Sequence, residues 1–447
     1  MNKRAMALGL TVAAFYQPAW SAGFIDDSKA SIGSRSLYFE SDQRGKNGVD
    51  QRQSVTGLRV DFNSGYTEGF MGVGLDVLGL LGVNLDGGIS PHSPATSNTI
   101  TPLKTNGTPV DNWSRVGANA RFKVAKTELK AGNALAPNLP VLVANDARLL
   151  PQSFQGAMLT SQDLDNVTFT AGQLNRAIGR ASSNWGGIAA GGRKGSDAFR
   201  FAGADWKPVK NLLLQYYYAQ LDDYYGQSFV GLVHDLQIDS QQSLKTDLRY
   251  FNSHSDGKNG SDPDYQYKSG YNAGGTGKID NTTWSAAFTY ALNAHSLTLG
   301  HQRVSDSGGM PYITNGNLVN GRGRSEGEGG ASVYLYTDIM INNFTRAGEN
   351  STFGIYRYDF AGMGLPGLRA QWTYVKGQDI RGIGNTTTGR YSEWESDYRL
   401  DYTLQSGSLK GLGVSLRRAN FRTELPTSTL QNQDQTRFYI NYTYALW

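Results

Sequence analysis

The last stretch of the chain, RFYINYTYAL from Arg437 to Leu446, alternates between two kinds of residue. Its even-numbered positions are apolar or aromatic, whereas most of its odd-numbered positions are polar. The even set is Phe438, Ile440, Tyr442, Tyr444 and Leu446, and the odd set includes Arg437, Tyr439, Asn441 and Thr443. Successive side chains of a β-strand point to opposite faces, so this period of two predicts a strand with one apolar and one polar face.

The same alternation recurs along the chain. Between Trp394 and Leu404 the even positions are mostly aromatic or apolar and the odd positions are mostly charged, and Leu58–Phe62 repeats the pattern. Further copies lie at Leu244–Tyr250, Trp284–Leu292, Leu368–Val375 and Gly411–Ala419. A soluble β-sandwich also alternates, with its polar face toward water, so alternation alone leaves both a sandwich and a membrane barrel open.

Features at the ends of the chain favour the barrel. Lys3 and Arg4 precede a short apolar run and then small residues, which is the layout of a cleaved export signal over residues 1–21. Trp447 closes the chain, and we expect it at the periplasmic membrane interface. Tyrosines and tryptophans near strand ends, and long Gly/Asn/Ser loops that alternate with short turns, are typical of outer-membrane barrels.

The interior of the chain argues against a helical membrane protein. The best apolar run, Val73–Val83, is interrupted by Asp76 and is far shorter than the ~20 residues that a spanning helix needs. No linker or shift of composition divides the chain, and its length fits about 16 to 18 strands of the usual 9–11 residues. We therefore predict an all-β fold, a transmembrane antiparallel β-barrel that forms one domain over residues 22–447.

Composition excludes several kinds of chemistry. The chain has no cysteine, which rules out disulfides, thiolate metal ligands and a cysteine nucleophile. Without Lys3 and Arg4, the other 40 of the 42 basic residues face 38 acidic ones. This near balance predicts no nucleic-acid partner, and any electrostatic function must come from where the charges lie.

One loop is unusually apolar for a segment without a strand or helix period. It is LPVLVANDARLLPQSFQG, Leu139–Gly156, which carries Asp146 and Arg148 among its aliphatic residues. Exposed loops are normally polar, so these apolar side chains need a surface to pack against. A surface loop with a few buried anchors is one interpretation. We prefer a loop folded into the lumen, with its apolar residues on the barrel wall and Asp146 and Arg148 toward a narrowed passage.

The sequence offers no convincing catalytic or metal site. The five histidines lack metal-ligand spacing, and the GxSxG match at Gly323, Ser325 and Gly327 lies in a charged, Gly-rich loop rather than between a buried strand and a helix. We therefore predict no catalytic residues, no metal and no cofactor.

Arginines on the polar strand faces are the remaining candidates for a function. The alternation places inside the lumen a set of basic residues that comprises Arg59, Arg121, Lys123, Arg249, Arg369, Arg399 and Arg417. Ordinary pore-lining charge, balanced by neighbouring acidic residues, is one explanation. The other is a row of sites for carboxylates, because guanidinium binds carboxylate through two parallel hydrogen bonds and moderate successive sites allow a solute to leave.

The sequence resembles the OprD family of outer-membrane carboxylate channels over essentially its whole mature length. The segments that carry the resemblance are GFIDDSKA at Gly23–Ala30, SGYTEGFMGVGLDVLGLLGVNLD at Ser64–Asp86, KTELKAG at Lys126–Gly132, Leu139–Gly156, TAGQLNRAIGRASSN at Thr170–Asn184, QSLKTDLRYF at Gln242–Phe251, MPYI at Met310–Ile313, GLPGL at Gly364–Leu368 and YVKGQDI at Tyr374–Ile380. The family implies an 18-stranded barrel, a monomer or loose trimer, with inward-folded constricting loops and a basic ladder.

The resemblance also assigns roles to residues. Asp146 and Arg148 would belong to the first constricting loop, Asp306 and Ser307 to the second, and Lys123 and Arg417 to the basic wall. The sequence departs from the expected ladder at Thr373 and Ser415, which are not basic. Arg369 and Arg399 stand where the family pattern has no basic residue.

Together these inferences predict a selective porin of the bacterial outer membrane that lets small carboxylates, such as amino acids or aromatic acids, diffuse into the periplasm. A porin of the same fold for neutral oligosaccharides is the main alternative. A barrel enzyme and an adhesive barrel with a plugged lumen are further alternatives. The expected partners are the solutes, outer-membrane lipid, lipopolysaccharide and the barrel-assembly machinery.

Overall fold

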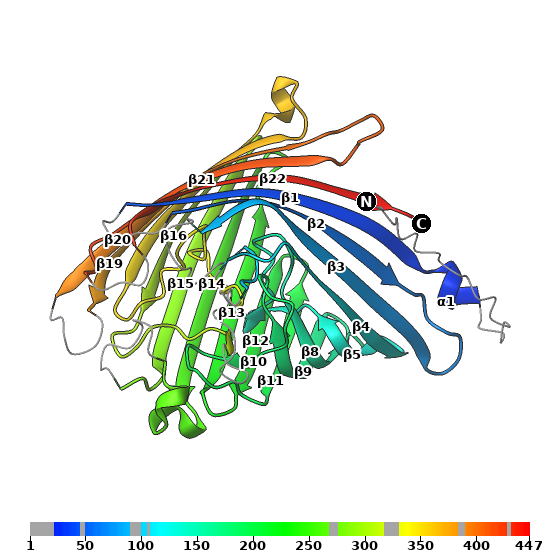
Figure 1. The fold of residues 1–447 in the computed structure, drawn as a ribbon, viewed down its shortest axis with the longest axis horizontal. Helices are drawn as coiled ribbons and strands as arrows, with labels where there is room; N and C mark the ends of the chain where they lie inside the picture. The colour runs from blue at the N-terminus through cyan, green and yellow to red at the C-terminus, as the bar shows by residue number, and fades with distance from the viewer. Residues whose placement is uncertain are drawn as a thin grey trace, which may run out of the picture.

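The computed structural model describes residues 22–44, 50–89, 100–104, 108–267, 276–316, 330–382, 389–426 and 431–447. Over these ranges the chain forms an antiparallel sheet of 18 strands that closes on itself, because the first strand pairs with both the second and the last (Figure 1). The predicted transmembrane antiparallel β-barrel is confirmed. The export signal predicted over residues 1–21 and the GxSxG match lie outside the described residues.

The barrel strands follow one another around the wall in chain order. They are β1 (Lys29–Gln43), β2 (Gln51–Asn63), β3 (Gly72–Ile89), β4 (Asn112–Val124), β5 (Thr127–Leu135), β8 (Ser153–Ser161), β9 (Val167–Ile178), β11 (Phe199–Val209), β12 (Leu212–Leu221), β13 (Tyr225–Gln237), β14 (Gln242–Ser255), β15 (Asp280–Leu292), β16 (His295–Val304), β18 (Asn350–Asp359), β19 (Leu368–Arg381), β20 (Arg390–Thr403), β21 (Gly413–Thr423) and β22 (Gln433–Ala445).

Smaller elements lie between the barrel strands. They are α1 (Ala22–Asp26), the 3₁₀ turns η1 (Gly257–Gly260), η2 (Pro263–Tyr265) and η3 (Phe360–Met363), and the short strands β6 (Asn138–Leu139), β7 (Leu142–Val143), β10 (Gly187–Ala189) and β17 (Thr314–Gly316). Within the described ranges, no helix combines the length and the apolar character needed to cross a membrane.

The alternation seen in the sequence separates the two faces of the barrel wall. Leu400, Leu416 and Ile440, on three successive strands, are 44%, 47% and 40% exposed. Arg437 and Tyr439, which alternate with them on β22, are 2% and 4% exposed. On these strands most apolar side chains therefore face outward and most polar ones inward, which is the opposite of a soluble sandwich and is the arrangement of a barrel surrounded by lipid.

Short turns connect the strands at one end of the barrel, and this end is called the short-turn end below. Only two residues separate β4 from β5 and β15 from β16. Ala125 and Asn293 in these turns have φ values of 50°. Two-residue hairpins need positive φ because only the mirror-image turns match the twist of the strands. Trp447 also lies at this end, where its Nε1 donates a hydrogen bond to Ser28 Oγ at 2.9 Å.

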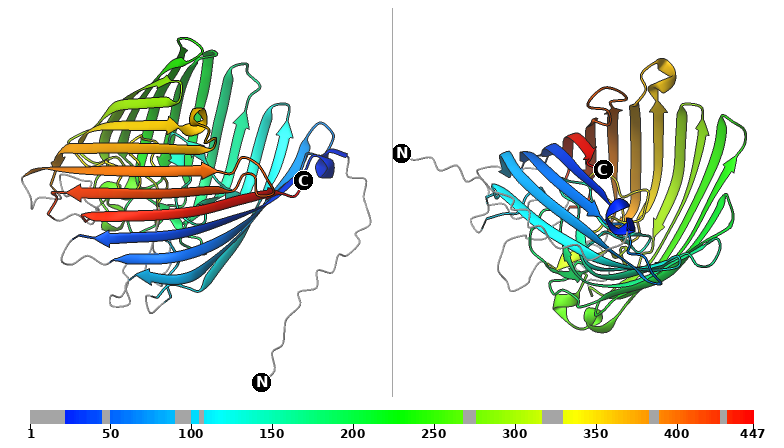
Figure 2. Two further views of the ribbon diagram at one scale, coloured as in Figure 1. Left: turned by 90° about the horizontal axis from the view of Figure 1, so that it is seen from above. Right: turned by 90° about the vertical axis from the view of Figure 1, so that its right-hand side faces the viewer.

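The longer connections lie at the opposite, long-loop end, and several of them fold back inside the wall (Figures 1 and 2). The short pairs β6–β7 and β10–β17 belong to these connections. Their buried residues join inward-facing aromatic residues of the wall, among them Phe199, Tyr217 and Phe229, in one hydrophobic cluster. The core of this protein is thus the space within the barrel rather than between sheets.

Close packing inside the wall leads to a first prediction. At Gly203 of β11, a Cβ atom would lie 2.1 Å from a ring carbon of Tyr217, its cross-strand neighbour, and 2.5 Å from the Tyr216 carbonyl oxygen. Gly203→Val should lower the free energy of unfolding by about 1–3 kcal/mol, because the buried ring and the backbone cannot both move away. The change can be measured by unfolding the barrel in urea and using the loss of its heat-modifiable electrophoretic mobility as the readout.

Gly354→Ala is the matched control, because the Cβ atom added there would meet only Leu299 Cδ2, at 3.6 Å, and a distant carbonyl. We expect this variant to unfold at the wild-type urea concentration. Equal destabilisation by the two substitutions would contradict the role given to the Tyr217 ring.

Candidate solute pathway

The apolar loop Leu139–Gly156 lies inside the barrel, as predicted. Val141, Leu142 and Phe154 join the cluster that lines the inner wall, whereas Leu149 and Leu150, each 2% exposed, pack with Leu37 and Phe39 of β1 and with neighbouring residues of β2, β3 and β22. The aliphatic residues therefore fix the loop to two parts of the wall. The polar residues lie between these two points of attachment.

Arg35 of β1 fixes the middle of this loop. Its Nη1 and Nη2 lie 2.6 and 3.2 Å from the two carboxylate oxygens of Asp146. Its Nη1 also donates to the Arg148 carbonyl oxygen at 2.8 Å, and its Nε donates to Asn441 Oδ1 of β22 at 3.1 Å. Asp146, predicted to face the passage, is thus already bound by an arginine of the wall.

Arg148 is enclosed rather than projecting freely into the passage. It is 6% exposed, and its guanidinium carbon lies 5.4 Å from the centre of the Phe39 ring. Nη1 donates to the Ala147 carbonyl oxygen at 2.9 Å, whereas Nε is buried and has no hydrogen-bond partner among the described residues. Burial, reinforced by the nearby Arg437 and Arg180 cations, lowers the pKa of Arg148. A nearby anion would relieve this cost.

Beside Arg148, inward-facing arginines form a row across neighbouring strands. Arg399 of β20 is directly opposite Arg417 of β21, and Arg417 is directly opposite Arg437 of β22. In the other direction, Gln371 of β19 separates Arg399 from Arg357 of β18. Residues that pair in this way have Cα atoms only about 4.5–5.5 Å apart, and like charges in such pairs repel one another. We call Arg357, Arg399, Arg417 and Arg437 the arginine row.

Most of the arginine row lacks an acidic partner. Arg417 Nε donates to Ser415 Oγ at 3.0 Å, Arg357 Nε to Gln371 Oε1 at 2.7 Å, and Arg437 Nη2 to Gln435 Oε1 at 2.7 Å and to the Met340 carbonyl. Arg399 alone in the row is ion-paired, with Asp401 at 2.6 Å. Across the described ranges, no carboxylate oxygen lies within 4.0 Å of the side-chain nitrogens of the other three.

The other arginines predicted for the lumen are neutralised by carboxylates on the strands. The Arg59 nitrogens contact Asp61 at 2.6 and 2.7 Å, and Arg369 Nε lies 2.9 Å from Asp359. Arg249 similarly pairs with Asp247 at 2.8 Å. For these three positions the ordinary interpretation, balanced pore-lining charge, describes the contacts better than a free anion site does.

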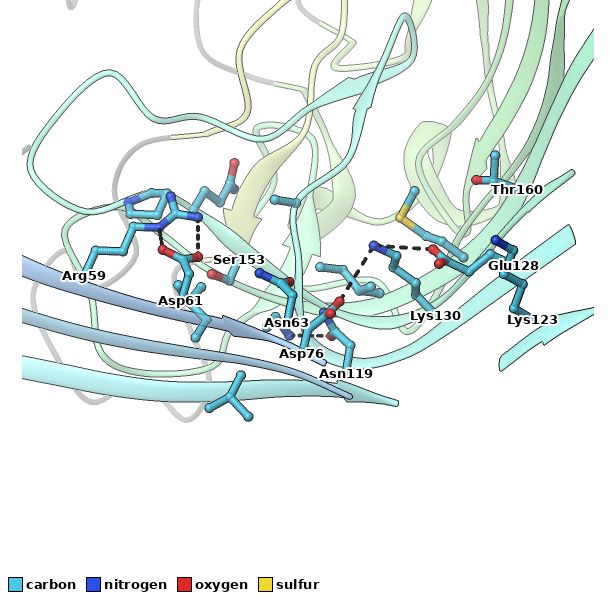
Figure 3. A pocket seen from close by; sticks show the side chains of 18 of the residues that line it. Arg59, Asp61, Asn63, Asp76, Asn119, Lys123, Glu128, Lys130, Ser153 and Thr160 are labelled. Atoms are coloured by element: carbon cyan, nitrogen blue, oxygen red, sulfur yellow. Dashed lines mark hydrogen bonds and ion pairs between the residues drawn. The ribbon is translucent and has the colours of Figure 1, made fainter. Parts of the chain in front are cut away.

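Arg121 and Lys123 lie on β4 near the short-turn end. Arg121 is buried with its Nε 2.9 Å from an Asp76 oxygen, and Lys123 Nζ lies 5.3 Å from the centre of the Tyr66 ring. Lys123 lines a cavity of about 650 Å³, together with Arg59 and Lys130 (Figure 3). Lys130 bridges Asp76 at 3.7 Å and Glu128 at 3.4 Å there, so the cavity carries charges of both signs.

Asp306 and Ser307, predicted for the second constriction, lie beyond β16 at the long-loop end. Asp306 Oδ1 accepts hydrogen bonds from Arg381 at 3.1 Å and Arg390 at 3.0 Å, at the ends of β19 and β20. Ser307 Oγ donates to the Asp280 carbonyl oxygen at 3.0 Å. Both side chains therefore hold their loop to the rim of the wall, and over the described part of the chain neither of them bonds to Arg148 or to the arginine row.

The segment 330–349 is a second inward connection, and it contacts the first. Ser332 N donates to the Val143 carbonyl oxygen at 2.9 Å. Farther along, the backbone amides of Ile341 and Asn342 donate to the Glu395 carboxylate at 2.8 and 2.9 Å, and Met340 N donates to Asp397 at 3.2 Å. Two carboxylates of β20 thus hold this segment against the wall beside the arginine row.

Arg35, Arg357 and Arg437 take part in this arrangement and were missing from the predicted site. All three occupy the inward phase of their strands, and the alternation that placed Arg399 inside could have identified Arg437 in the same way. What the sequence did not indicate is which inward arginines have an acidic neighbour, because this depends on strand register and loop position.

The fold and the inward-facing charges define a porin, a barrel channel of the outer membrane. The family model for outer membrane porins of the OprD family matches residues 22–446, and the chain belongs to this family.

Similar proteins agree with this assignment. Porin D of Pseudomonas aeruginosa is 31% identical over 95% of this chain and 92% of its own length. The crystal structure of OccK8 (OprE) from the same species has a TM-score of 0.83 and 40% identity, and covers 95% of this chain and 100% of that one. OpdK, solved with vanillate, has a TM-score of 0.78 and 32% identity at the same coverage. The protein is a porin of the bacterial outer membrane, with its short-turn end toward the periplasm.

The contact between Glu395 and segment 330–349 can be tested directly. Glu395→Ala removes the acceptor of the buried Asn342 amide and of the partly buried Ile341 amide, at a cost of roughly 1–3 kcal/mol for a buried amide left unpaired. We expect the segment to detach from the wall, which should raise the open-channel noise and the mean conductance in planar bilayers.

Glu424→Ala is the control for this experiment, because Glu424 accepts its hydrogen bonds from Ser392 at the rim and not from the inward segment. It should leave the traces unchanged. If Glu395→Ala shows the same open-channel noise and mean conductance as the wild type, the two amide contacts do not hold the segment.

Acid should release the Asp306 loop. The hydrogen bonds from Arg390 and Arg381 lower the pKa of Asp306 below its usual value of 3.8. A carboxylate with a lowered pKa stabilises the folded loop above its ordinary pKa, and this contribution is lost as the pH falls through the lowered value. Amide exchange of residues 305–309 should therefore stay slow at neutral pH and quicken, relative to its intrinsic rate, only in strong acid. Asp306→Asn should show fast exchange at every pH, and slow exchange in this variant would contradict the role of the ion pairs.

Proposed function

We propose that this porin admits small carboxylates to the periplasm and that the arginine row, together with Arg148, is where they bind on the way. Passage is by diffusion down a concentration gradient. No covalent step is part of the proposal, and it assigns no catalytic role to any side chain.

The observation that carries this proposal is a set of neighbouring guanidinium groups without acidic partners. Arg417 and Arg437 lie directly opposite each other on neighbouring strands. Their positive charges add to the effect of burial in lowering the pKa of Arg148. The Nε groups of Arg148 and Arg437 are buried and, within the described ranges, have no hydrogen-bond acceptor. Like charges this close repel one another, and a carboxylate that accepts hydrogen bonds from the more exposed Arg417 would offset that repulsion.

The position of the row supports its use as a path. Arg437 lies eight residues before the periplasmic end of β22, whereas Arg357 lies two residues before the periplasmic end of β18. The row therefore descends from the inward loops toward the periplasm as it crosses the tilted strands. Several neighbouring sites of moderate strength favour passage, since a solute can move to the next site without leaving all its partners at once.

Relatives offer independent support for a carboxylate. OpdK, 32% identical to this chain, was solved with vanillate, which is an aromatic carboxylate. This supports a carboxylate substrate and, within that class, makes aromatic acids the first compounds to try.

The alternative of a neutral-sugar porin would require open aromatic faces along the lumen. Tyr334 and Tyr336 are the inward aromatic pair on segment 330–349, but Arg249 covers both, with its guanidinium carbon 3.9 and 4.7 Å from the ring centres. Tyr336 is also stacked on Phe353 at 5.7 Å. These rings are already occupied, which favours the carboxylate proposal.

The role of the row is tested by comparing solutes in one channel. Arg417→Gln combined with Arg437→Gln should lower the uptake of benzoate or vanillate into proteoliposomes roughly tenfold, in line with the loss of about one or two charge-assisted hydrogen bonds. Glucose entry measured in the same vesicles should change much less, because a neutral solute does not depend on the cations.

Arg369→Gln is the control, since Arg369 has the inward phase of β19 but is already paired with Asp359. It should leave carboxylate uptake close to wild type. Equal losses for benzoate and glucose in the double variant, or an equal loss of benzoate uptake in the control, would contradict the proposal.

Other predicted partners remain proposals as well. We propose contact with outer-membrane lipid and lipopolysaccharide, insertion by the barrel-assembly machinery, and a monomeric or loosely trimeric state.

A further inference from the structure

A charged cluster lies on the outer face of the barrel, at the long-loop edge of the apolar outer surface. Its centre is Asp434 of β22, which alternates with the inward Gln433 and Gln435 and has the outward phase of Phe438 and Ile440. Despite this phase, the Asp434 side chain is only 2% exposed. Arginine side chains cover it, and these lie near the extracellular ends of β1 and β21.

Three arginines share this one carboxylate. Arg422 Nη1 lies 2.7 Å and Arg418 Nη2 lies 3.4 Å from the Asp434 oxygens, and Arg44 donates to it as well. The side chains of Arg44, Arg418 and Arg422 are 49%, 42% and 32% exposed. The Asp434 carboxylate is therefore buried beneath the cations, and the three guanidinium groups remain partly exposed on the outer face. We call these three residues the outer arginine cluster.

Acidic residues other than Asp434 also lie beside the outer arginine cluster, on the side of Arg44. Asp42 lies 3.5 Å from Arg44, and Glu40 is paired with Arg52 at 3.1 Å. Arg418 and Arg422 have no carboxylate other than Asp434 within 4.0 Å among the described residues. Arg418 and Arg422 therefore share one buried carboxylate, which also accepts a hydrogen bond from Asn420 at 2.8 Å.

The depth of the cluster in the membrane follows from the strands that carry it. On β21 the outward residue that follows Arg418 toward the periplasm is Leu416, which is 47% exposed, and on β22 the outward series continues with Phe438 and Ile440. Arg418 to Leu416 is about 7 Å along a strand. The outer arginine cluster thus begins where the apolar outer surface ends, at the level of the lipid headgroups.

We propose that the outer arginine cluster binds a phosphate group of the glycolipid in the outer leaflet, that is, a phosphate of lipid A. Arginine binds phosphate oxygens through its planar set of donors, and basic clusters between hydrophobic and aqueous regions bind anionic headgroups. Asp434 positions the guanidinium groups without being exposed itself, so its charge faces the cations and not the incoming phosphate. Arg422 also lies 5.9 Å from the centre of the Trp394 ring, an outward aromatic group suited to this interface.

The outward phase separates this site from the solute pathway. Arg417 faces the lumen and its neighbour Arg418 faces the membrane, because successive residues of β21 point to opposite sides of the wall. A defect in this site should therefore leave conductance and solute selectivity unchanged, and the inference does not depend on which solute the channel passes.

The experiment uses the purified full-length barrel in detergent and measures lipid A binding by native mass spectrometry. Wild-type protein should retain bisphosphorylated lipid A and should bind lipid A stripped of its phosphates roughly tenfold more weakly, as expected for lost charge-assisted hydrogen bonds. Arg418→Gln combined with Arg422→Gln should bind both lipids at this weaker level. Free inorganic phosphate at millimolar concentration should compete poorly, because it lacks the acyl chains that hold the headgroup at this depth.

Arg200→Gln is the matched control. Arg200 also faces outward, on β11, but it is paired with its own Asp222 at 2.6 Å. It should bind lipid A as wild type does, and all variants should show wild-type heat-modifiable mobility and conductance.

Equal binding of phosphorylated and dephosphorylated lipid A by the wild type would overturn the proposal without reference to any variant. An unchanged affinity in the double variant would also overturn it. So would a change in oligomeric state by light scattering without a change in lipid binding, since that would make the cluster a contact between subunits.

Discussion

The structure depends on one constraint, which is that no backbone amide or carbonyl in the membrane can be left without a hydrogen-bond partner. A sheet meets this condition only when its first and last strands pair, as β1 and β22 do here. Closure turns one face of every strand toward lipid and the other toward an enclosed space. The two faces of the barrel wall therefore differ in function. The outer face contacts the membrane, whereas the inner face supports the inward loops and borders the path for solutes.

Inside this space, the effect of an arginine is set by its nearest carboxylate. Arg59 and Arg369 each have an acidic residue at hydrogen-bonding distance, so they contribute little free charge. Arg417 and Arg437 face each other across two strands without such a partner, and the loop brings a third cation, Arg148, beside them. Among the described residues, the lumen therefore holds arginines in direct ion pairs and arginines without one, and the second kind has more to gain from a bound anion.

Much of the fold could be predicted from the sequence because the period of two is local. The alternation around Arg437–Leu446 and Trp394–Leu404 indicated which side chains face inward, and the apolar character of Leu139–Gly156 indicated a loop with a buried surface. Both predictions are confirmed. The strand number needed the resemblance to a family, because length alone allowed 16 or 18.

The site was harder to predict because its contacts join distant parts of the chain. The pairing of Asp146 with Arg35 spans 111 residues and has no local signature. Arg148 was expected at the passage, and it lies beneath Phe39 because the aliphatic residues on both sides of it are anchored to the wall. Arg437 was visible in the alternation, but nothing near it in sequence showed that it would lack a carboxylate. These facts depend on register and loop placement, which a single sequence does not reveal.

The position of Arg35 has a consequence for the order of folding. Arg35 binds the inward loop through Asp146 and the last strand through Asn441, and Tyr439 of that strand donates to the Ala147 carbonyl at 3.1 Å. The loop is thus held by the two strands that meet only when the barrel closes. Contacts between such distant segments form late, since the entropy of closing the chain between them must be overcome first. We therefore expect the inward loop to reach its final position only after β1 and β22 have paired, and to come loose from the wall when that seam opens.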